Sequence, residues 1–162
     1  DMCLGSYCFF WGQKQESTST WHGMYLSNGN PTEAVDVMHY CWKGHWPEKR
    51  APSIQEIFLN GKSWEANHTF NKSDEIELSY IVDKYNNEEI YLNFEVYPET
   101  FSTQQGGDFQ KSPEKIDFMI LNESTNKLVF RAPKKNGAYR IFVFAKNSHS
   151  QCSVANMPFL VN

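Results

Sequence analysis

The first apolar stretch of the chain runs from Leu4 to Trp11 without alternation of apolar and polar positions. This pattern is typical of a strand that is buried on both faces, usually in a parallel sheet. Gly12 ends the stretch, and a polar run over residues 13–16 follows at once. The pattern therefore predicts a parallel strand over residues 4–11, with hydrogen-bonding side chains at its carboxyl end, where α/β folds bind ligands.

A helix is predicted over residues 31–43. Asn30 suits the N-cap, Pro31 suits the first helical position, and Glu33 gives capping-box spacing. Gly44 occupies the position of a left-handed C-cap. The apolar residues of this segment repeat with a helical period and predict one buried face: Ala34, Val35, Met38, Cys41 and Trp42. Strand 4–11 and this helix together make one βα unit.

The stretch from His45 to Ser53 contains two prolines and three charged residues, which is typical of a domain boundary. Beyond it, the period of the apolar residues changes from 3.6 to 2. We therefore predict a terminal βα unit over residues 1–46, a linker over residues 47–53 and a β domain over residues 54–162.

The second domain is predicted to be an immunoglobulin-like antiparallel β-sandwich of about seven strands, so the fold class is mainly β. Pro158 cannot donate to a ladder, so the last strand should be an edge at that residue. Tyr139 follows Asn136-Gly137 at the start of the penultimate strand, which is the position of a tyrosine corner. The predicted strands are 54–59, 75–82, 90–97, 116–121, 127–131, 138–146 and 153–161.

Composition and charge exclude some partners. The net charge is −4 and the pI is about 5.7, with no basic stripe that would indicate nucleic acid. No apolar run approaches the ~20 residues of a membrane span. The N-terminus lacks the basic and apolar regions of a signal peptide, so a signal for export would precede Asp1.

Four cysteines, Cys3, Cys8, Cys41 and Cys152, allow three connectivities if all of them pair. Cys8 and Cys41 lie in apolar stretches, which favours buried free thiols over a disulfide framework. Sequons at Asn67, Asn71 and Asn122 are compatible with export.

The residues around the end of the predicted strand resemble a sugar site. Trp11 and Trp21 offer indole faces for a pyranose ring, and Gln13, Gln15 and Glu16 offer partners for its hydroxyls. The alternative is that both tryptophans are core or interface residues.

The carboxylates and metal-ligand side chains give weaker signals. His39 and Cys41 are two residues apart, so they cannot ligate one metal while the helix persists, and no metal site is predicted. An acidic turn with Asp83, Glu88 and Glu89 has oxygen ligands suited to calcium, but such turns are normally only solvated.

A glycosidase needs a pair of carboxylates. Glu33 and Asp36 are explained by helix capping and the helix dipole, which leaves Glu16 without a partner. No catalytic residue is therefore predicted.

Two long runs resemble a known family. CLGSYCFFWGQKQESTSTWHGMYLSNGNPTEAVDVMHYCWKGHWPE, residues 3–48, is similar to the final strand and helix of the catalytic barrel in bacterial proteins related to family-2 glycoside hydrolases. APKKNGAYRIFVFAKNSHSQCSVANMPFLV, residues 132–161, resembles the last strands of the immunoglobulin- or PKD-like domain that follows such a barrel.

The resemblance implies that Trp11 ends the eighth barrel strand and lines a sugar subsite. The family's catalytic carboxylates lie on earlier strands, so the resemblance implies no catalytic residue in this chain. It implies the C-terminal accessory region of a secreted, periplasmic or cell-surface bacterial glycoside hydrolase. Its partners would be the rest of the barrel, in the same or a separate chain, and a poly- or oligosaccharide.

Two other functions stay open. The first is an autonomous carbohydrate-binding module with Trp64, Phe101 and Phe109 as further stacking residues; the last two lie in the long connection 98–113. The second is a structural or adhesive immunoglobulin-like domain.

Overall fold

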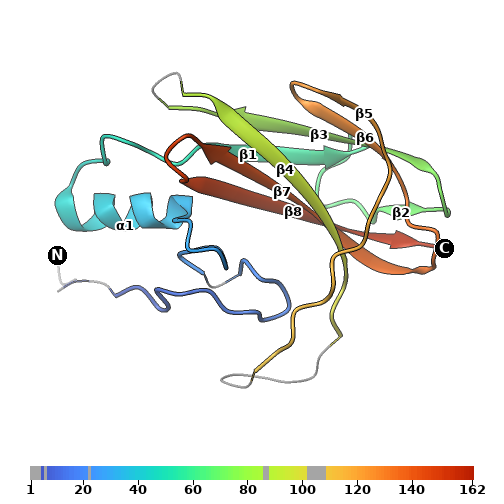
Figure 1. Ribbon diagram of the computed structural model, residues 1–162, viewed down its shortest axis with the longest axis horizontal. Helices are drawn as coiled ribbons and strands as arrows, with labels where there is room; N and C mark the ends of the chain where they lie inside the picture. Colours follow the sequence, from blue (N-terminus) through green and yellow to red (C-terminus); the bar gives the residue numbers. More distant parts are fainter. Residues whose placement is uncertain (1–4, 6, 22, 86–87, 102–108) are drawn as a thin grey trace.

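The computed structural model describes residues 5, 7–21, 23–85, 88–101 and 109–162. This part of the chain is mainly β, with one helix and two four-stranded sheets that enclose one apolar core (Figure 1). The elements are α1 Glu33–Lys43, β1 Ser53–Leu59, β2 Thr69–Phe70, β3 Glu75–Asp83, β4 Ile90–Pro98, β5 Ile120–Ser124, β6 Lys127–Arg131, β7 Gly137–Asn147 and β8 Cys152–Val161.

The strand orders are β1-β3-β6-β5 in one sheet and β2-β8-β7-β4 in the other. All pairs are antiparallel except β2–β8, which is parallel. Immunoglobulin-type domains place strands A, B, E and D in one sheet and C, F and G in the other. The present orders match that arrangement, with β2 added beside the last strand, so the sandwich is immunoglobulin-like.

The core follows the alternation of the strands. On β7, Ile141, Val143 and Ala145 are fully buried between the sheets, while the residues between them belong to the outer face. Phe130 on β6 lies at the centre, 5.4 Å from the ring of Phe118 and 6.3 Å from that of Phe159. Burial of each such side chain contributes roughly 1.5–3 kcal/mol.

The prediction of a mainly β, immunoglobulin-like sandwich is confirmed, but the described part of the chain has eight strands rather than about seven. All seven predicted ranges overlap observed strands, although β5 begins at Ile120, and Ile116 makes only an isolated bridge to Val96. The two-residue β2 was missed because it is too short to show a period. Tyr139 forms the expected corner, since its hydroxyl donates to the Lys135 carbonyl oxygen at 3.0 Å. At Pro158, β8 pairs with β7 alone, as an edge strand does.

The predicted strand 4–11 is not observed. Residues 5 and 7–11 lie outside any strand, and residues 4 and 6 lie outside the described part of the chain. The side chain of Tyr7 is 99% exposed and that of Phe9 is 88% exposed. No neighbouring strand pairs with this segment in the described structure. The sequence pattern of a strand buried on both faces therefore occurs here without the paired strands and covering side chains that such a strand needs.

The helix is shorter than predicted at its start. Thr32 is the N-cap and its side chain makes no capping hydrogen bond, so the proposed Asn30 cap and capping box are wrong. Asn30 instead accepts a hydrogen bond from the Leu26 backbone, and Pro31 bridges to Tyr25. The predicted C-cap is confirmed, because Gly44 has a φ of 75° and its N–H donates to the Tyr40 carbonyl.

The predicted buried face of the helix is also wrong. Cys41 and Trp42 are exposed, and the buried residue of α1 is the polar Asp36. The Asp36 carboxylate accepts a hydrogen bond from the Ala51 backbone N–H at 2.7 Å, and Glu33 accepts one from the Ser53 hydroxyl at 2.7 Å. The acidic first turn therefore fastens α1 to the start of β1, while Cys41 and Trp42 on the predicted buried face remain exposed.

A stack of flat groups also crosses the predicted linker. The Arg50 guanidinium lies 3.8 Å from the ring of Trp46 on one side and 3.8 Å from that of Tyr85 on the other. Trp46 in turn stacks on Tyr40 of α1, with ring centroids 4.6 Å apart. Residues 51–53 are buried, so the end of this segment is packed against the sandwich.

The described cysteines, Cys8, Cys41 and Cys152, are free thiols. The expected burial is wrong for Cys41, which is exposed, and only partial for Cys8. Cys152 is the buried thiol, and burial raises its pKa to about 11. No helix within the described ranges is long and apolar enough to cross a membrane.

Candidate functional site

The outer face of the β2-β8-β7-β4 sheet carries an unusual mixture of aromatic and charged side chains. Residues on β4 and β7 that alternate with the core residues form cross-strand pairs on this face. The pairs are Tyr91 with Lys146, Asn93 with Phe144, Glu95 with Phe142, and Tyr97 with Arg140. Phe142 is only 4% exposed, so this face is partly covered.

The cover is the N-terminal segment, residues 12–21 and 23–30. The Ser17 backbone N–H donates to the Gln110 side chain at 2.7 Å, and Thr100 donates to the Ser17 carbonyl at 2.9 Å. Ser112 donates to the Gln15 side chain at 3.2 Å. Both ends of the long connection between β4 and β5 therefore hold the segment in front of the sheet.

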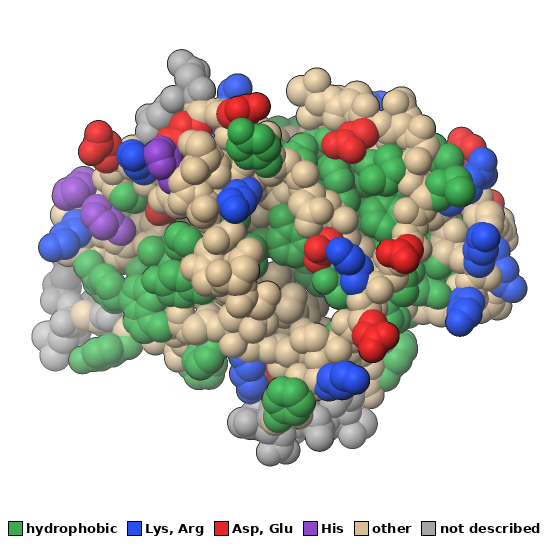
Figure 2. All heavy atoms as spheres, in the orientation of Figure 1, with side chains coloured by type: hydrophobic (Ala, Val, Ile, Leu, Met, Phe, Trp, Pro, Cys, Tyr) green, Lys and Arg blue, Asp and Glu red, His purple; other side chains and the backbone are tan. Residues whose placement is uncertain are grey.

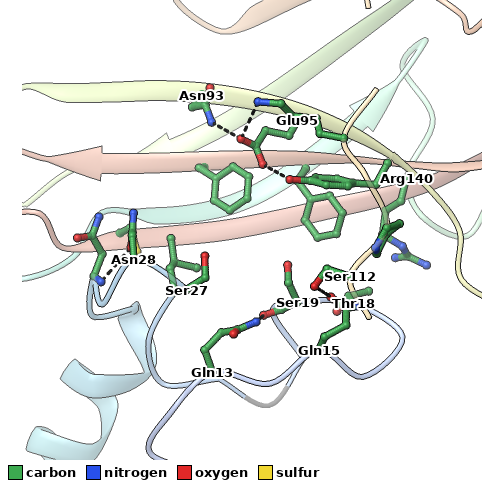
Figure 3. Close-up of a pocket in the computed structure, with 18 of the residues that line it drawn as sticks. Gln13, Gln15, Thr18, Ser19, Ser27, Asn28, Asn93, Glu95, Ser112 and Arg140 are labelled. Carbon is green, nitrogen blue, oxygen red and sulfur yellow. Dashed lines mark hydrogen bonds and ion pairs between the residues drawn. The ribbon is translucent and has the colours of Figure 1, made fainter. Parts of the chain in front are cut away.

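A cavity of about 520 Å³ lies between this segment and the sheet; we call it the sheet-face cavity. Figure 3 shows Gln13 and Gln15 on its N-terminal side and Asn93 and Glu95 on its sheet side. Its volume is within the range of about 300–1,000 Å³ that small-molecule sites occupy. Amides, hydroxyls, charged groups and aromatic rings all contribute to its lining.

Glu95 is the best-positioned polar group of the sheet-face cavity. Its carboxylate accepts hydrogen bonds from the Tyr97 hydroxyl at 2.7 Å and the Asn93 amide at 3.2 Å, and from Lys115 Nζ at 3.4 Å. Burial, followed by the hydrogen bond to Glu95, raises the pKa of Tyr97 far above its usual value. Tyr97 therefore stays protonated and acts as a donor that fixes the carboxylate.

Arg140 lies at the boundary between this cavity and a second one. Its guanidinium pairs with Glu99 at 2.7 Å and donates to the Asn156 side chain. The second cavity, about 630 Å³, lies on the other side of Ser17 and Thr18 and includes Trp21 in its lining. Ser17, Thr18 and Leu26 of the N-terminal segment line both cavities, so this segment separates them.

One buried polar atom of the N-terminal segment, Nε2 of Gln15, lacks a hydrogen-bond partner in the described structure. A buried donor or acceptor left unpaired costs about 1–3 kcal/mol. The packing of the segment on the sheet is therefore incomplete in the described structure.

The structure separates the predicted sugar-binding residues. Gln13 and Gln15 line the sheet-face cavity, and Trp21 lines the second cavity. Trp11 lines neither; its ring packs 5.6 Å from Trp42 and 6.2 Å from Tyr25 and is 43% exposed. Glu16 forms an ion pair with Lys14 at 2.8 Å.

The three further aromatic candidates lie apart from both cavities. Trp64, Phe101 and Phe109 are 75%, 82% and 84% exposed, and none of them lines either cavity. Their role in binding stays a prediction.

The sheet-face residues were missed by sequence reasoning, although a signal was present. In the run Ile141 to Ala145, the core residues alternate with Phe142 and Phe144, so β7 is apolar on both faces. A strand at the surface of a sandwich normally has a polar outer face. The two phenylalanines therefore indicated that the outer face of β7 is covered or binds a partner.

The acidic turn and the carboxylates of α1 have other partners. Glu88 lies 3.5 Å from His149, and Glu89 accepts a hydrogen bond from the Tyr91 hydroxyl at 2.8 Å. Asp83 ends β3 opposite Ser53. Among the residues that the structure describes, no three His, Cys, Asp or Glu side chains form a group able to hold a metal ion. His39 and His45 lie ring to ring at 5.1 Å as a pair.

The fold and the site together define a class: an immunoglobulin-like sandwich with a cavity between one sheet face and an N-terminal extension. No family model and no curated protein matches the chain. Similar solved structures include PcoC, a methionine-rich copper resistance protein from Escherichia coli, at 14% identity, a TM-score of 0.40 and coverage of 69% of this chain and 99% of that chain. Murine CRIg matches at 7% identity and a TM-score of 0.36, with coverage of 68% and 96%. These values describe a distant likeness only.

Proposed function

We propose that this chain is the C-terminal accessory region of a secreted, periplasmic or cell-surface bacterial glycoside hydrolase. It supports a catalytic barrel and contacts carbohydrate, and it is not catalytic alone. The observation that carries the proposal is the large exposed apolar surface of residues 7–46.

Aromatic side chains dominate this surface. Figure 2 shows apolar groups gathered over the end of the molecule that holds α1. Contiguous apolar patches of this kind mark sites of protein contact. The exposed fractions are 99% for Tyr7, 88% for Phe9, 38% for Phe10, 43% for Trp11, 44% for Tyr40, 51% for Trp42 and 41% for Trp46.

A barrel would cover this surface in a specific way. In a (β/α)₈ barrel, each strand pairs on both sides and its following helix packs on the outside of the sheet. Residues 4–11 would then become the buried strand that their sequence predicts, and the Trp42 side of α1 would meet that strand and its neighbours. The unpaired Nε2 of Gln15 also fits a segment that changes its surroundings when the barrel is present.

The sheet-face cavity supports the carbohydrate part of the proposal. It combines aromatic rings with amides and hydroxyls, which is the chemistry of a site for a small polar ligand. The same observation supports the alternative of an autonomous carbohydrate-binding module, which would bind sugar without any barrel.

Two measurements test the accessory role. The coding sequence before Asp1 should encode the earlier strands of a barrel. Amide hydrogen exchange at residues 7–11 and 41–46 should slow at least about tenfold in the longer polypeptide relative to this chain, because pairing and burial protect amides. Absence of a barrel upstream, or equal exchange in both proteins, would contradict the proposal.

A further inference from the structure

We propose that the sheet-face cavity binds a neutral sugar ring against the β4–β7 face, with Phe144 as the stacking surface and Glu95 as the acceptor for sugar hydroxyls. This inference rests on the carbohydrate part of the function proposed above. It assigns that contact to a site other than the predicted Trp11 and Trp21.

The floor of the cavity is a pair of nearly parallel rings. Phe142 and Phe144 lie with centroids 6.1 Å apart at an interplanar angle of 17°. Tyr97 meets Phe142 edge to face at 5.6 Å and 89°, which holds that ring in place. Phe142 is covered, whereas Phe144 is only half-buried. Phe144 therefore offers a fixed apolar surface for the C–H groups of a pyranose ring.

Glu95 supplies the directional contact. An ionised carboxylate has about four acceptor positions, and Tyr97, Asn93 and Lys115 fill three of them. Its side chain is 19% exposed, so an acceptor position remains accessible. Hydrogen bonds to a carboxylate are about twice as strong as neutral ones, and the three donors fix its orientation before the ligand arrives.

The charges of the cavity select a neutral ligand. Its lining holds two carboxylates, Glu95 and Glu99, and three cations, Lys115, Arg140 and Lys146. Lys115 interacts with Glu95 and Arg140 pairs with Glu99, so most of this charge is compensated locally. Glu95 would repel an anionic ligand, and the three basic groups would repel a cationic one. The remaining polar groups are uncharged and include Gln13, Asn28 and Ser112.

The test is a titration of the intact 162-residue chain with neutral trisaccharides (cellotriose, xylotriose, mannotriose and maltotriose) and with trigalacturonate as the acidic counterpart. Amide chemical shifts locate the site, and calorimetry gives the affinity. We expect at least one neutral trisaccharide to shift the resonances of Glu95 and Phe144. Glu95→Gln should weaken binding about 10- to 100-fold, because a hydrogen bond to a charged group is lost.

The matched control is Glu77→Gln. Glu77 is also a strand glutamate paired with a lysine, Lys127 at 3.0 Å, but it lies on β3 in the other sheet. This variant should bind like the original chain. Phe144→Leu should lose several-fold in affinity while it retains an apolar side chain, and the thermal midpoint of each variant checks its folding.

Several results would overturn the inference. These are no binding of any neutral trisaccharide at millimolar concentration, shifts confined to Trp11, Trp21 or Trp64, equal losses in Glu95→Gln and Glu77→Gln, or preferential binding of trigalacturonate. Failure of the accessory role would show separately, because hydrogen exchange at residues 7–11 does not report on this cavity.

Discussion

Strand β7 and the segment from Tyr7 to Trp11 are two apolar stretches with opposite outcomes. Both have apolar residues on both faces of a potential strand. β7 has β4 and β8 as hydrogen-bonded neighbours, the core on one face and the N-terminal segment on the other. Residues 7–11 have no strand neighbour in the described structure, and their aromatic rings are largely exposed.

The difference shows that an apolar run specifies a strand only where other strands supply its hydrogen bonds and other side chains cover it. In the sandwich, those groups come from the same chain. In the N-terminal region, the described part of the chain does not supply them. The proposed function assigns them to the rest of a barrel.

The largest expected effect contrasts two phenylalanines. Phe130→Ala should lower the free energy of unfolding by about 3–5 kcal/mol, because Phe130 is fully buried among aromatic neighbours. Phe9→Ala should change it by less than about 0.5 kcal/mol, since Phe9 is 88% exposed. Urea denaturation of both variants measures this difference. A loss of stability above about 1 kcal/mol for Phe9→Ala would contradict it.

A smaller effect is expected where the two regions meet. Arg50→Ala should cost about 1–3 kcal/mol, because it removes a guanidinium held between Trp46 and Tyr85. The control is Arg131→Ala, whose ion pair with Glu75 is solvent-exposed and should be worth less than about 1 kcal/mol. Thermal unfolding of the two variants measures this difference. Equal losses of stability would mean that the stack does not join the two regions.

Tyr139→Phe should cost about 1 kcal/mol, because it removes the hydroxyl that donates to the Lys135 carbonyl and leaves the ring in the core. Tyr7→Phe should cost nothing measurable, since Tyr7 is 99% exposed. Chemical denaturation of this matched pair checks the tyrosine corner, and equal stability of the two variants would rule out a contribution from it.

The smallest expected effect is a pH dependence at Asp36. Burial raises the pKa of this carboxyl above its ordinary value of 3.8, against the opposing hydrogen bond from Ala51 and the charge of Arg50. A raised pKa in the folded state makes its contribution to stability greatest below the unfolded pKa and smaller as pH rises through the folded value.

Asp36→Asn removes this titration and retains an acceptor for Ala51. The stability of the variant relative to the original chain should therefore increase as pH rises from about 3 to about 6. Denaturation curves across this range test the sign of this pH dependence. If the stability of the variant relative to the original chain fell as pH rose, burial would not be the dominant influence on the pKa of Asp36.

The sandwich could be predicted from the sequence because its signals are local. Alternation marks the strands, and Asn136-Gly137 before Tyr139 marks the corner, whereas Thr69 and Phe70 are too few to show a period. The prediction of a buried helix face was wrong although Cys41 and Trp42 have the right period, because the period alone does not say which residues cover them. Asp36 was assigned to the helix dipole, but it binds a backbone group 15 positions away, which no local pattern shows.

The candidate site was predicted only in part. Gln13 and Gln15 were identified from their place after an apolar run. Glu95 and Phe144 come from strands on the far side of the cavity, and their meeting with the N-terminal segment depends on long-range contacts such as Ser112 with Gln15. The outward phenylalanines of β7 were the available signal.

The contiguous stack of Tyr40, Trp46, Arg50 and Tyr85 has a mechanical consequence. Rotation of the helix about the segment between Gly44 and Ser53 would require four flat groups to slide apart. The stack therefore restrains that segment and connects α1 to Tyr85, which lies in the connection between β3 and β4. A domain packed against α1 would therefore be held at a fixed orientation relative to the sandwich.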